Sequence, residues 1–174
     1  MTDIPRYWHA VYTTSRSEKR VKERFEIQGI EHFLPIQTII RQWKYRKQKV
    51  RIPVIAGMIF VKVSRAEQLQ VLKTPGVVTF LRLRGSSTAA IIPDKQIEDF
   101  RFLVEYSDHE IEITNENIEI GDRVIVTGGS LQGLTGELIQ RKGEFKVIVR
   151  IEAFGCAMVT IPGALVEPVK NISI

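Results

Sequence analysis

The residues best suited to chemistry in this chain are cations interleaved with aromatic rings between positions 41 and 51. Six of these eleven residues are Lys or Arg. Cationic side chains attract phosphates and aromatic rings stack on bases, which is how proteins hold single-stranded nucleic acid without reading its sequence. The candidate nucleic-acid contacts in this segment are Arg41, Trp43, Lys44, Arg46, Lys47 and Lys49. The alternative is a solvated hairpin tip whose charges only keep the protein in solution.

The reactive side chains that an enzyme or a metal site needs are scattered. His9, His32 and His109 fall in three separate segments, and the single cysteine, Cys156, excludes an internal disulfide. The glycines between 128 and 136 lie between two predicted strands, whereas a dinucleotide loop joins a strand to a helix. We therefore expect no catalytic residue, no metal, no cofactor and no enzymatic activity.

Charge divides the chain into two parts. Residues 1–105 hold 19 Lys and Arg against 10 Asp and Glu, a net charge of +9, whereas residues 106–174 have a net charge of −4. This asymmetry suggests two units with different partners, the basic one nearer to nucleic acid. No apolar run reaches the roughly 18 residues of a membrane span, and no signal peptide is apparent, so we expect a cytoplasmic monomer.

The basic half shows alternating strand and helix patterns. Ser15 or Ser17 can cap a helix that ends before Gly29, and Ser64 with Glu67 forms a capping box. The predicted strands are 8–13, 32–40, 54–63 and 77–83. The first predicted helix is 18–28, with Val21 and Phe25 buried. A second helix follows 64–67, with Leu69 and Leu72 pointing inward, and a third begins at Asp94, with Ile97, Phe100 and Val104 pointing inward. This order predicts an α+β domain in which helices pack on an antiparallel sheet.

The acidic half is predicted to be all β after a linker. Residues 106–118 are acidic with little core material, and we interpret them as a linker that is partly extended. From Glu119 onward short alternating segments are separated by glycine-rich turns, including a hairpin at 141–144. Residues 145–151 are β-branched or aromatic at most positions, which favours a strand over a helix. Residues 119–174 are thus predicted to form a small β-barrel.

One apolar segment, 53–62, has two interpretations. Met58 and Phe60 share a face of the predicted strand, beside Gly57. Such a strand is usually core, but methionine and aromatic side chains also line grooves that bind helices. The residues alone favour the core interpretation.

Together these segments resemble the NusG family of transcription elongation factors. Four N-terminal segments occur in the family's order, and 120–139 resembles a KOW motif; the four are 7–12, 54–61, 74–81 and 92–97. The resemblance implies an NGN-type domain at 1–105, a linker at 106–118 and an SH3-like KOW domain at 119–174. Segments 29–35, 41–43 and 74–78 look most like the specialised paralogues, RfaH and especially the UpxY antiterminators of capsular polysaccharide operons.

The resemblance also implies a mechanism and its residues. The N-terminal domain would bind the clamp helices of the largest RNA polymerase subunit, reach the gate loop, and make elongation more processive. By motif position, Tyr12, Ile55, Met58 and Phe60 would line the clamp-helix groove, supported by Phe80 and Leu81. Glu67, Gln68 and Leu69 would face the gate loop, and Arg16, Lys19 and Arg20 the non-template DNA or nascent RNA.

Two departures from the family pattern bear on the partners. The usual Phe-Pro-Gly-Tyr is Ile55-Ala56-Gly57-Met58 here, which removes two aromatic contacts from the groove. The usual Phe-Gly-Arg is Phe154-Gly155-Cys156, which weakens the expected contact of Phe154 with a small-subunit ribosomal protein or with Rho. The alternatives are a ribosome- or RNA-binding KOW protein and a housekeeping NusG.

Overall fold

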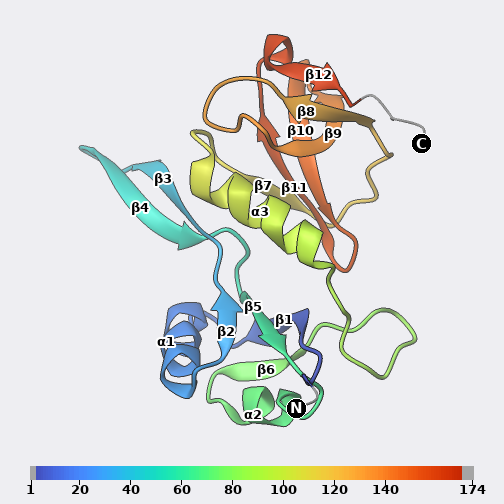
Figure 1. Cartoon of the computed structure of the whole chain (residues 1–174). Coiled ribbons are helices and arrows are strands. Elements are labelled where there is room, and N and C mark those ends of the chain that lie inside the picture. Colours follow the sequence, from blue (N-terminus) through green and yellow to red (C-terminus); the bar gives the residue numbers. More distant parts are fainter. Residues whose placement is uncertain (1–2, 170–174) are drawn as a thin grey trace, which may run out of the picture. The chain divides into compact units, whose positions relative to one another are not determined.

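The computed structural model describes residues 3–169, which form two compact units (Figure 1). The first unit contains residues up to 36 and 53–97, and the second contains 37–52 and the residues from 98 onward. The α+β fold of the N-terminal part and the β-rich C-terminal part confirm the predicted fold class.

The first unit is built on a four-stranded antiparallel sheet in the order β2-β5-β1-β6. Its strands are β1 (Tyr7–Thr13), β2 (Glu31–Phe33), β5 (Met58–Val63) and β6 (Val77–Phe80). The predicted strand 54–63 is central, but it begins only at Met58. Gly57 precedes it with φ of 72°, a left-handed conformation that ends regular strand geometry and favours glycine. The strand expected to reach residue 83 ends at Phe80.

Two helices cover this sheet. α1 (Glu18–Gln28) contacts β2 and β5, and α2 (Gln68–Lys73) contacts β6 (Figure 1). α1 has the predicted bounds, ends at Gly29 with φ of 70°, and buries Val21 and Phe25 completely. The core between helices and sheet comprises Val11, Val21, Phe25, Ile30, Leu34, Ile59, Val61, Val63, Val71 and Phe80.

The prediction for the buried face of α2 was wrong. Leu69 and Leu72 are 58% and 40% exposed, and Val71 is the buried residue. The helix has only six residues, so one apolar side chain is enough to attach it to the sheet. The pair of leucines therefore lies on the solvent side and is available for contacts with other molecules.

The predicted extended segment 32–40 is two strands rather than one. β2 ends at Phe33 and β3 (Ile36–Gln42) begins after Pro35, because proline has no N–H to donate to a strand ladder. The Pro35 carbonyl instead accepts a hydrogen bond from the N–H of Val54 at 2.8 Å. β3 pairs with β4 (Lys47–Pro53) in a two-stranded ribbon.

α3 (Asp94–Tyr106) follows the loop after β6. Ile97 and Phe100 are buried as predicted, but the third inward residue is Leu103 rather than Val104, which is only partly buried. Leu103 and Val104 follow Phe100 by three and four residues, and both spacings place a side chain on the same helix face. The sequence pattern therefore did not distinguish Leu103 from Val104.

The second unit contains a six-stranded antiparallel sheet in the order β12-β8-β9-β10-β11-β7. Its strands are β7 (Glu112–Thr114), β8 (Asp122–Val126), β9 (Thr135–Arg141), β10 (Glu144–Ile151), β11 (Gly155–Thr160) and β12 (Val166–Pro168), with a 3-10 turn at Gly163–Leu165. The hairpin predicted at 141–144 is confirmed. Lys142 and Gly143 both have positive φ, 53° and 80°, as a two-residue β-hairpin turn requires.

Residues 106–118, which the sequence suggested as a linker, contribute a strand. β7 pairs with β11, placing Cys156 opposite Thr114 and Met158 opposite Glu112. Gly155 permits this pairing, since a Cβ there would collide with the Thr114 carbonyl oxygen. Val147, Val149 and Ile151 are buried on β10, but Phe145, which strand alternation places on the same face, is 42% exposed.

Candidate functional site

The first candidate surface lies where β1 ends and β5 begins. Tyr12 pairs with Met58 across the two strands, and its side chain is 39% exposed. Ile55, in the loop before β5, is partly buried. The structure therefore presents an aromatic ring and a neighbouring apolar loop at one end of the sheet.

A buried carboxylate fixes that loop. Glu18, in the first turn of α1, is only 6% exposed, and its Oε1 accepts a hydrogen bond from the Gly57 N–H at 2.7 Å. The N–H of Thr13 donates to the Gly57 carbonyl at 2.9 Å. The sequence analysis missed Glu18, because a glutamate in the first turn of a helix usually reflects the helix dipole alone.

The other residues expected in the clamp-helix groove are buried. Met58 is 4% exposed and Phe60 is 0% exposed, with the Phe60 ring stacked on Phe33 at a centroid distance of 6.1 Å. Phe80 and Leu81 are 4% and 8% exposed. Met58 pairs with Tyr12, and Phe60 pairs with Ala10, so both lie on the same face of the sheet as Tyr12 and support the surface from below. Phe80 pairs with Val11 and packs in the core on the opposite face, so its expected support of the clamp-helix surface is not seen in the structure.

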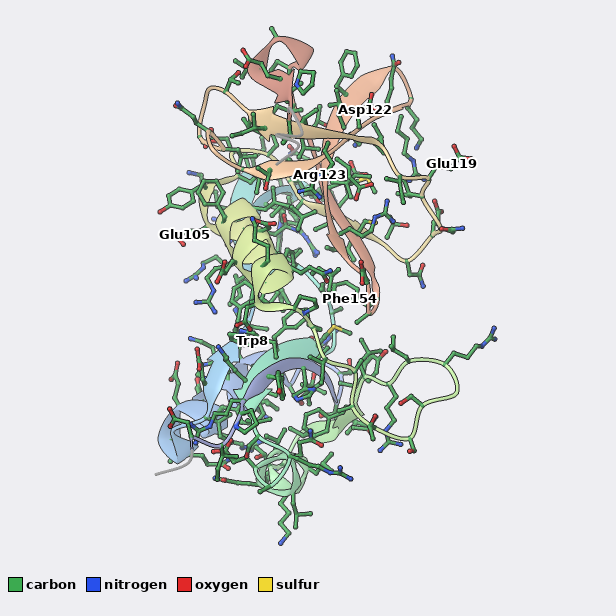
Figure 2. The ribbon with its side chains drawn as sticks, turned by 45° about the vertical axis from the view of Figure 1, so that its right-hand side comes forward. Trp8, Glu105, Glu119, Asp122, Arg123 and Phe154 are labelled. Carbon is green, nitrogen blue, oxygen red and sulfur yellow. The ribbon has the colours of Figure 1, made fainter. Side chains whose placement is uncertain are left out.

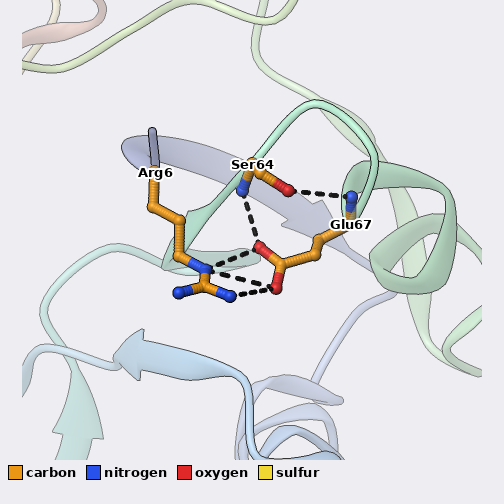
Figure 3. A network of polar contacts seen from close by, with 3 residues as sticks. All are labelled: Arg6, Ser64 and Glu67. Carbon is orange, nitrogen blue, oxygen red and sulfur yellow. Dashed lines mark hydrogen bonds and ion pairs between the residues drawn. The ribbon is translucent and has the colours of Figure 1, made fainter. Parts of the chain in front are cut away.

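The capping box at the start of α2 is confirmed and is extended by an arginine (Figure 3). The N–H of Ser64 donates to Glu67 Oε2 at 2.7 Å, and the N–H of Glu67 donates to Ser64 Oγ at 3.3 Å. Arg6 donates to the same carboxylate from Nε at 2.9 Å and from Nη2 at 2.8 Å. These bonds lower the pKa of Glu67 from 4.5 to about 2, and the hydrogen bonds from Arg6 make the largest contribution.

This network predicts a pH-dependent contribution to stability. Because the pKa of Glu67 is lower in the folded protein, its stabilisation is complete above the unfolded value of 4.5 and is lost as the pH falls towards 2. The free energy of unfolding of the wild type should therefore exceed that of Glu67→Gln near neutral pH, and the difference should disappear in acid. Urea titrations of both proteins over this range measure it, and a difference that is independent of pH would contradict the assignment.

The two residues after Glu67 differ in exposure. Gln68 is partly buried and lines a groove between α2 and residues 82–91, whereas Leu69 is 58% exposed. Of the three side chains expected to face a gate loop, Glu67 is thus engaged within the domain and Leu69 is the one that projects into solvent.

The cations and rings of segment 41–51 gather on the ribbon formed by β3 and β4. The turn is closed by a 2.8 Å hydrogen bond from the Trp43 N–H to the Arg46 carbonyl. Trp43 and Tyr45 are 55% and 88% exposed, and Lys44 Nζ lies 5.4 Å from the Tyr45 ring centroid. Arg41, Lys44, Arg46, Lys47 and Lys49 are all exposed.

The base of the ribbon is attached to the segment before β7. Gln37 Nε2 donates to the Ile111 carbonyl at 3.2 Å, while the Ile111 N–H donates to Gln37 Oε1 at 2.8 Å. One side-chain amide thus satisfies both backbone groups of Ile111. The exposed tip is therefore carried on an anchored base.

The cations expected on the first helix belong to the other unit. Arg16, Lys19 and Arg20 are exposed, and Arg16 has φ of 58° in the turn before α1. By contrast, Arg24 donates to the Pro75 carbonyl at 2.6 Å and Lys22 pairs with Glu26 at 3.1 Å. The three expected contacts are thus the helix cations that remain available.

Phe154 lies in the turn between β10 and β11 (Figure 2). It is partly buried, and its N–H donates to the Ile151 carbonyl at 3.0 Å. Cys156, two residues on, is fully buried in β11, and burial raises the pKa of its thiol. The departure from the family's Phe-Gly-Arg pattern thus replaces an arginine with a buried side chain.

Two ion pairs stabilise the barrel, and the sequence analysis did not identify either. Arg150 donates to Glu137 from Nε at 2.8 Å and from Nη2 at 3.0 Å, which lowers the pKa of Glu137. Lys146, only 4% exposed, donates from Nζ to Glu112 of β7 at 2.6 Å. Both pairs join segments far apart in the sequence, so no local spacing indicated them.

Within residues 3–169, no group of three or more His, Cys, Asp or Glu side chains is placed to hold a metal ion. No helix in that part of the chain has the length and apolar character needed to cross a membrane.

Comparison with known proteins places the chain in a family. Residues 6–101, more than half of the chain, match the family model described as transcription termination factor nusG. The Transcription termination/antitermination protein NusG of Rickettsia felis is 27% identical over 158 residues, covering 83% of this chain and 81% of that protein.

One solved structure supports the fold. The structure described as "Domain interaction in Thermotoga maritima NusG" aligns with a TM-score of 0.52 and 20% identity, over 95% of this chain and 98% of the other. The MjSpt4:Spt5 complex in conformation B aligns over 94% and 97% with 20% identity, but its TM-score of 0.33 is too low to support an argument. The match of residues 6–101, with which the Rickettsia relative agrees, shows that the chain belongs to the NusG family of non-enzymatic transcription elongation and antitermination factors.

Proposed function

We propose that this chain binds RNA polymerase on the clamp helices of the largest subunit and makes elongation more processive. Tyr12 and Ile55 would contact the clamp helices, with Met58, Phe60 and Leu81 supporting the surface. The start of α2, through Gln68 and Leu69, would face the gate loop, and Glu67 would hold that start in place. The protein would act in the cytoplasm.

The observation that carries this proposal is the half-exposed ring of Tyr12 beside a loop fixed by Glu18. Its side chain is 39% exposed, and the Glu18–Gly57 hydrogen bond of 2.7 Å holds the adjoining loop. A rigid, partly exposed aromatic ring loses little entropy on binding, and tyrosine is enriched among residues that dominate interface energies. Family membership supports polymerase as the partner.

A narrower proposal is that the chain serves a polysaccharide operon. Its support is the likeness of segments 29–35, 41–43 and 74–78 to the UpxY antiterminators. The barrel, through Phe154, is proposed to retain at most a weak contact with a small-subunit ribosomal protein, because Cys156 replaces the family's arginine. A general NusG role is the alternative within the family.

The basic ribbon is proposed to hold non-template DNA or nascent RNA weakly. Each phosphate contact with a single strand adds about 0.7 to the slope of log affinity against log salt. Neutralising Lys44, Arg46, Lys47 and Lys49 to glutamine should therefore flatten that slope by about three units if all four contact phosphates. Filter binding of an oligothymidylate over a range of salt measures the slope.

A matched control removes four other exposed cations. Lys73, Arg84, Arg123 and Lys142 are exposed and lie outside the proposed contacts. Neutralising them changes the net charge equally and should leave most of the slope in place. If both variants lose the same slope, the ribbon cations contribute only through overall charge.

Affinity purification of the tagged full-length chain from its native cells tests the partner. Recovery of RNA polymerase subunits in stoichiometric amount is the expected result. Co-sedimentation with ribosomes and no recovery of polymerase would favour the alternative of a ribosome- or RNA-binding KOW protein.

A further inference from the structure

A groove in the first unit lies on the opposite face of β1 from Tyr12. The volume of this groove is about 820 Å³. Phe80 of β6 lies among its lining residues, with Leu72 of α2 and Ile91 of the following loop. Tyr7 also lines it, and successive β1 residues alternate between the two faces of the sheet, so Tyr7 and Tyr12 point to opposite sides.

The apolar residues of this groove are unusually open to solvent. Tyr7 is 46% exposed, Leu72 is 40% exposed and Ile91 is 56% exposed, while Phe80 is 4% exposed. Exposed apolar side chains gathered around a concave surface are typical of binding grooves. A ligand with apolar side chains would cover these residues.

The charges that line the groove are all positive. Its lining includes Arg65 and Arg82 but no aspartate or glutamate. Within residues 3–169 neither arginine has a hydrogen-bond or ion-pair partner, unlike Arg6, which is held by Glu67. His9 also lines the groove, but burial lowers its pKa, so it adds no charge near neutral pH. The groove is thus complementary to a negatively charged ligand.

The arrangement favours an extended peptide over other anions. Arg65 precedes α2 and Arg82 follows β6, so the groove receives a cation from each of two elements, and a ligand with several acidic groups can pair with both. A nucleic acid would place sugar and phosphate on Leu72 and Ile91, which offer no hydrogen bonds. A peptide that alternates acidic and aliphatic residues supplies both kinds of contact along its length.

We propose that this groove binds an extended acidic segment of a partner protein that carries aliphatic side chains. The net charge of +9 on residues 1–105 would attract such a segment before it docks. The site is separate from the proposed clamp-helix surface, because Tyr7 and Tyr12 lie on opposite faces of β1. Peptide binding in this groove can therefore be tested independently of polymerase binding through Tyr12.

Fluorescence anisotropy of the full-length chain tests the proposal, with a labelled ten-residue peptide of alternating glutamate and leucine as the probe. Saturable binding is expected, and Arg65→Glu with Arg82→Glu should weaken it at least about tenfold, since two favourable charge contacts become repulsive. Lys19→Glu with Arg20→Glu makes the same change in net charge on α1 and should weaken it by less than about threefold. Leu72→Ser, at an exposed position, should also weaken binding while leaving the circular dichroism spectrum unchanged.

Three outcomes would overturn the proposal. One is the absence of saturable binding, and another is equal loss of affinity in the two charge-reversal variants, which would indicate general attraction. The third is that a peptide of alternating glutamate and serine, or decanoate alone, binds as tightly as the probe. The first of these peptides lacks aliphatic side chains, and decanoate carries a single charge, so either result would assign the groove to a different ligand.

Discussion

Phe60→Asp is expected to unfold the first unit rather than only to remove a binding contact. Phe60 is 0% exposed and stacks on Phe33 in the middle of the sheet. Placing a carboxylate there without a partner costs several kcal/mol, roughly the cost of burying an unpaired polar or charged group. Because whole domains are stable by only about 5–15 kcal/mol, that loss is large enough to abolish cooperative folding.

Thermal unfolding followed by circular dichroism measures this effect, with Phe60→Leu as the control. Leucine keeps an apolar side chain and should retain a cooperative transition at a lower temperature. A wild-type transition in Phe60→Asp would show that the side chain is not part of the core. Phe60 would then again be a direct candidate for the clamp-helix contact, as its position in the family motif suggests.

The sequence predicted the order of elements well because local signals were strong. α1 has the predicted bounds because Gly29 ends it, and the hairpin at 141–144 formed because Gly143 permits a positive φ. The Ser64–Glu67 capping box also formed as predicted. Each of these features is decided by residues close together in the chain, which is what a pattern can detect.

The candidate surfaces were harder to predict because they depend on tertiary neighbours. The alternation of Met58 and Phe60 identified a strand face, but it did not show that this face would be buried. Val71 rather than Leu69 or Leu72 attaches α2, because a six-residue helix needs only one such contact. The bond from Gly57 to Glu18 joins residues 39 positions apart, so no local spacing revealed it.

The pairing of the extended part of segment 106–118 could not be predicted for a related reason. β7 is only three residues long, and although Ile113 and Thr114 favour a strand, the acidic residues around them do not. It is held by pairing with β11 and by the ion pair of Glu112 with Lys146 at 2.6 Å. Composition alone therefore indicated a linker where long-range pairing makes an edge strand.

Tyr12→Asp is expected to weaken polymerase binding at least about thirtyfold while the domain stays folded. The Tyr12 ring is 39% exposed, so the substituted carboxylate remains hydrated in the free protein. On binding, that charge would be desolvated against an apolar partner, and removal of an anchoring tyrosine commonly costs 2 kcal/mol or more, roughly a thirtyfold loss of affinity. Circular dichroism should show an unchanged fold.

Tyr7→Asp is the matched control. Tyr7 lies on the same strand with 46% of its side chain exposed, but on the opposite face. The substitution therefore introduces the same charge at similar exposure without altering the proposed clamp-helix surface.

Titration of the labelled full-length chain with purified core RNA polymerase tests the central claim most directly. The wild type and Tyr7→Asp should bind with affinities within about threefold of each other, and Tyr12→Asp should bind at least about thirtyfold more weakly. Wild-type affinity in Tyr12→Asp, equal losses in both variants, or no binding by the wild type would contradict the proposal that this end of the sheet is the polymerase-binding surface.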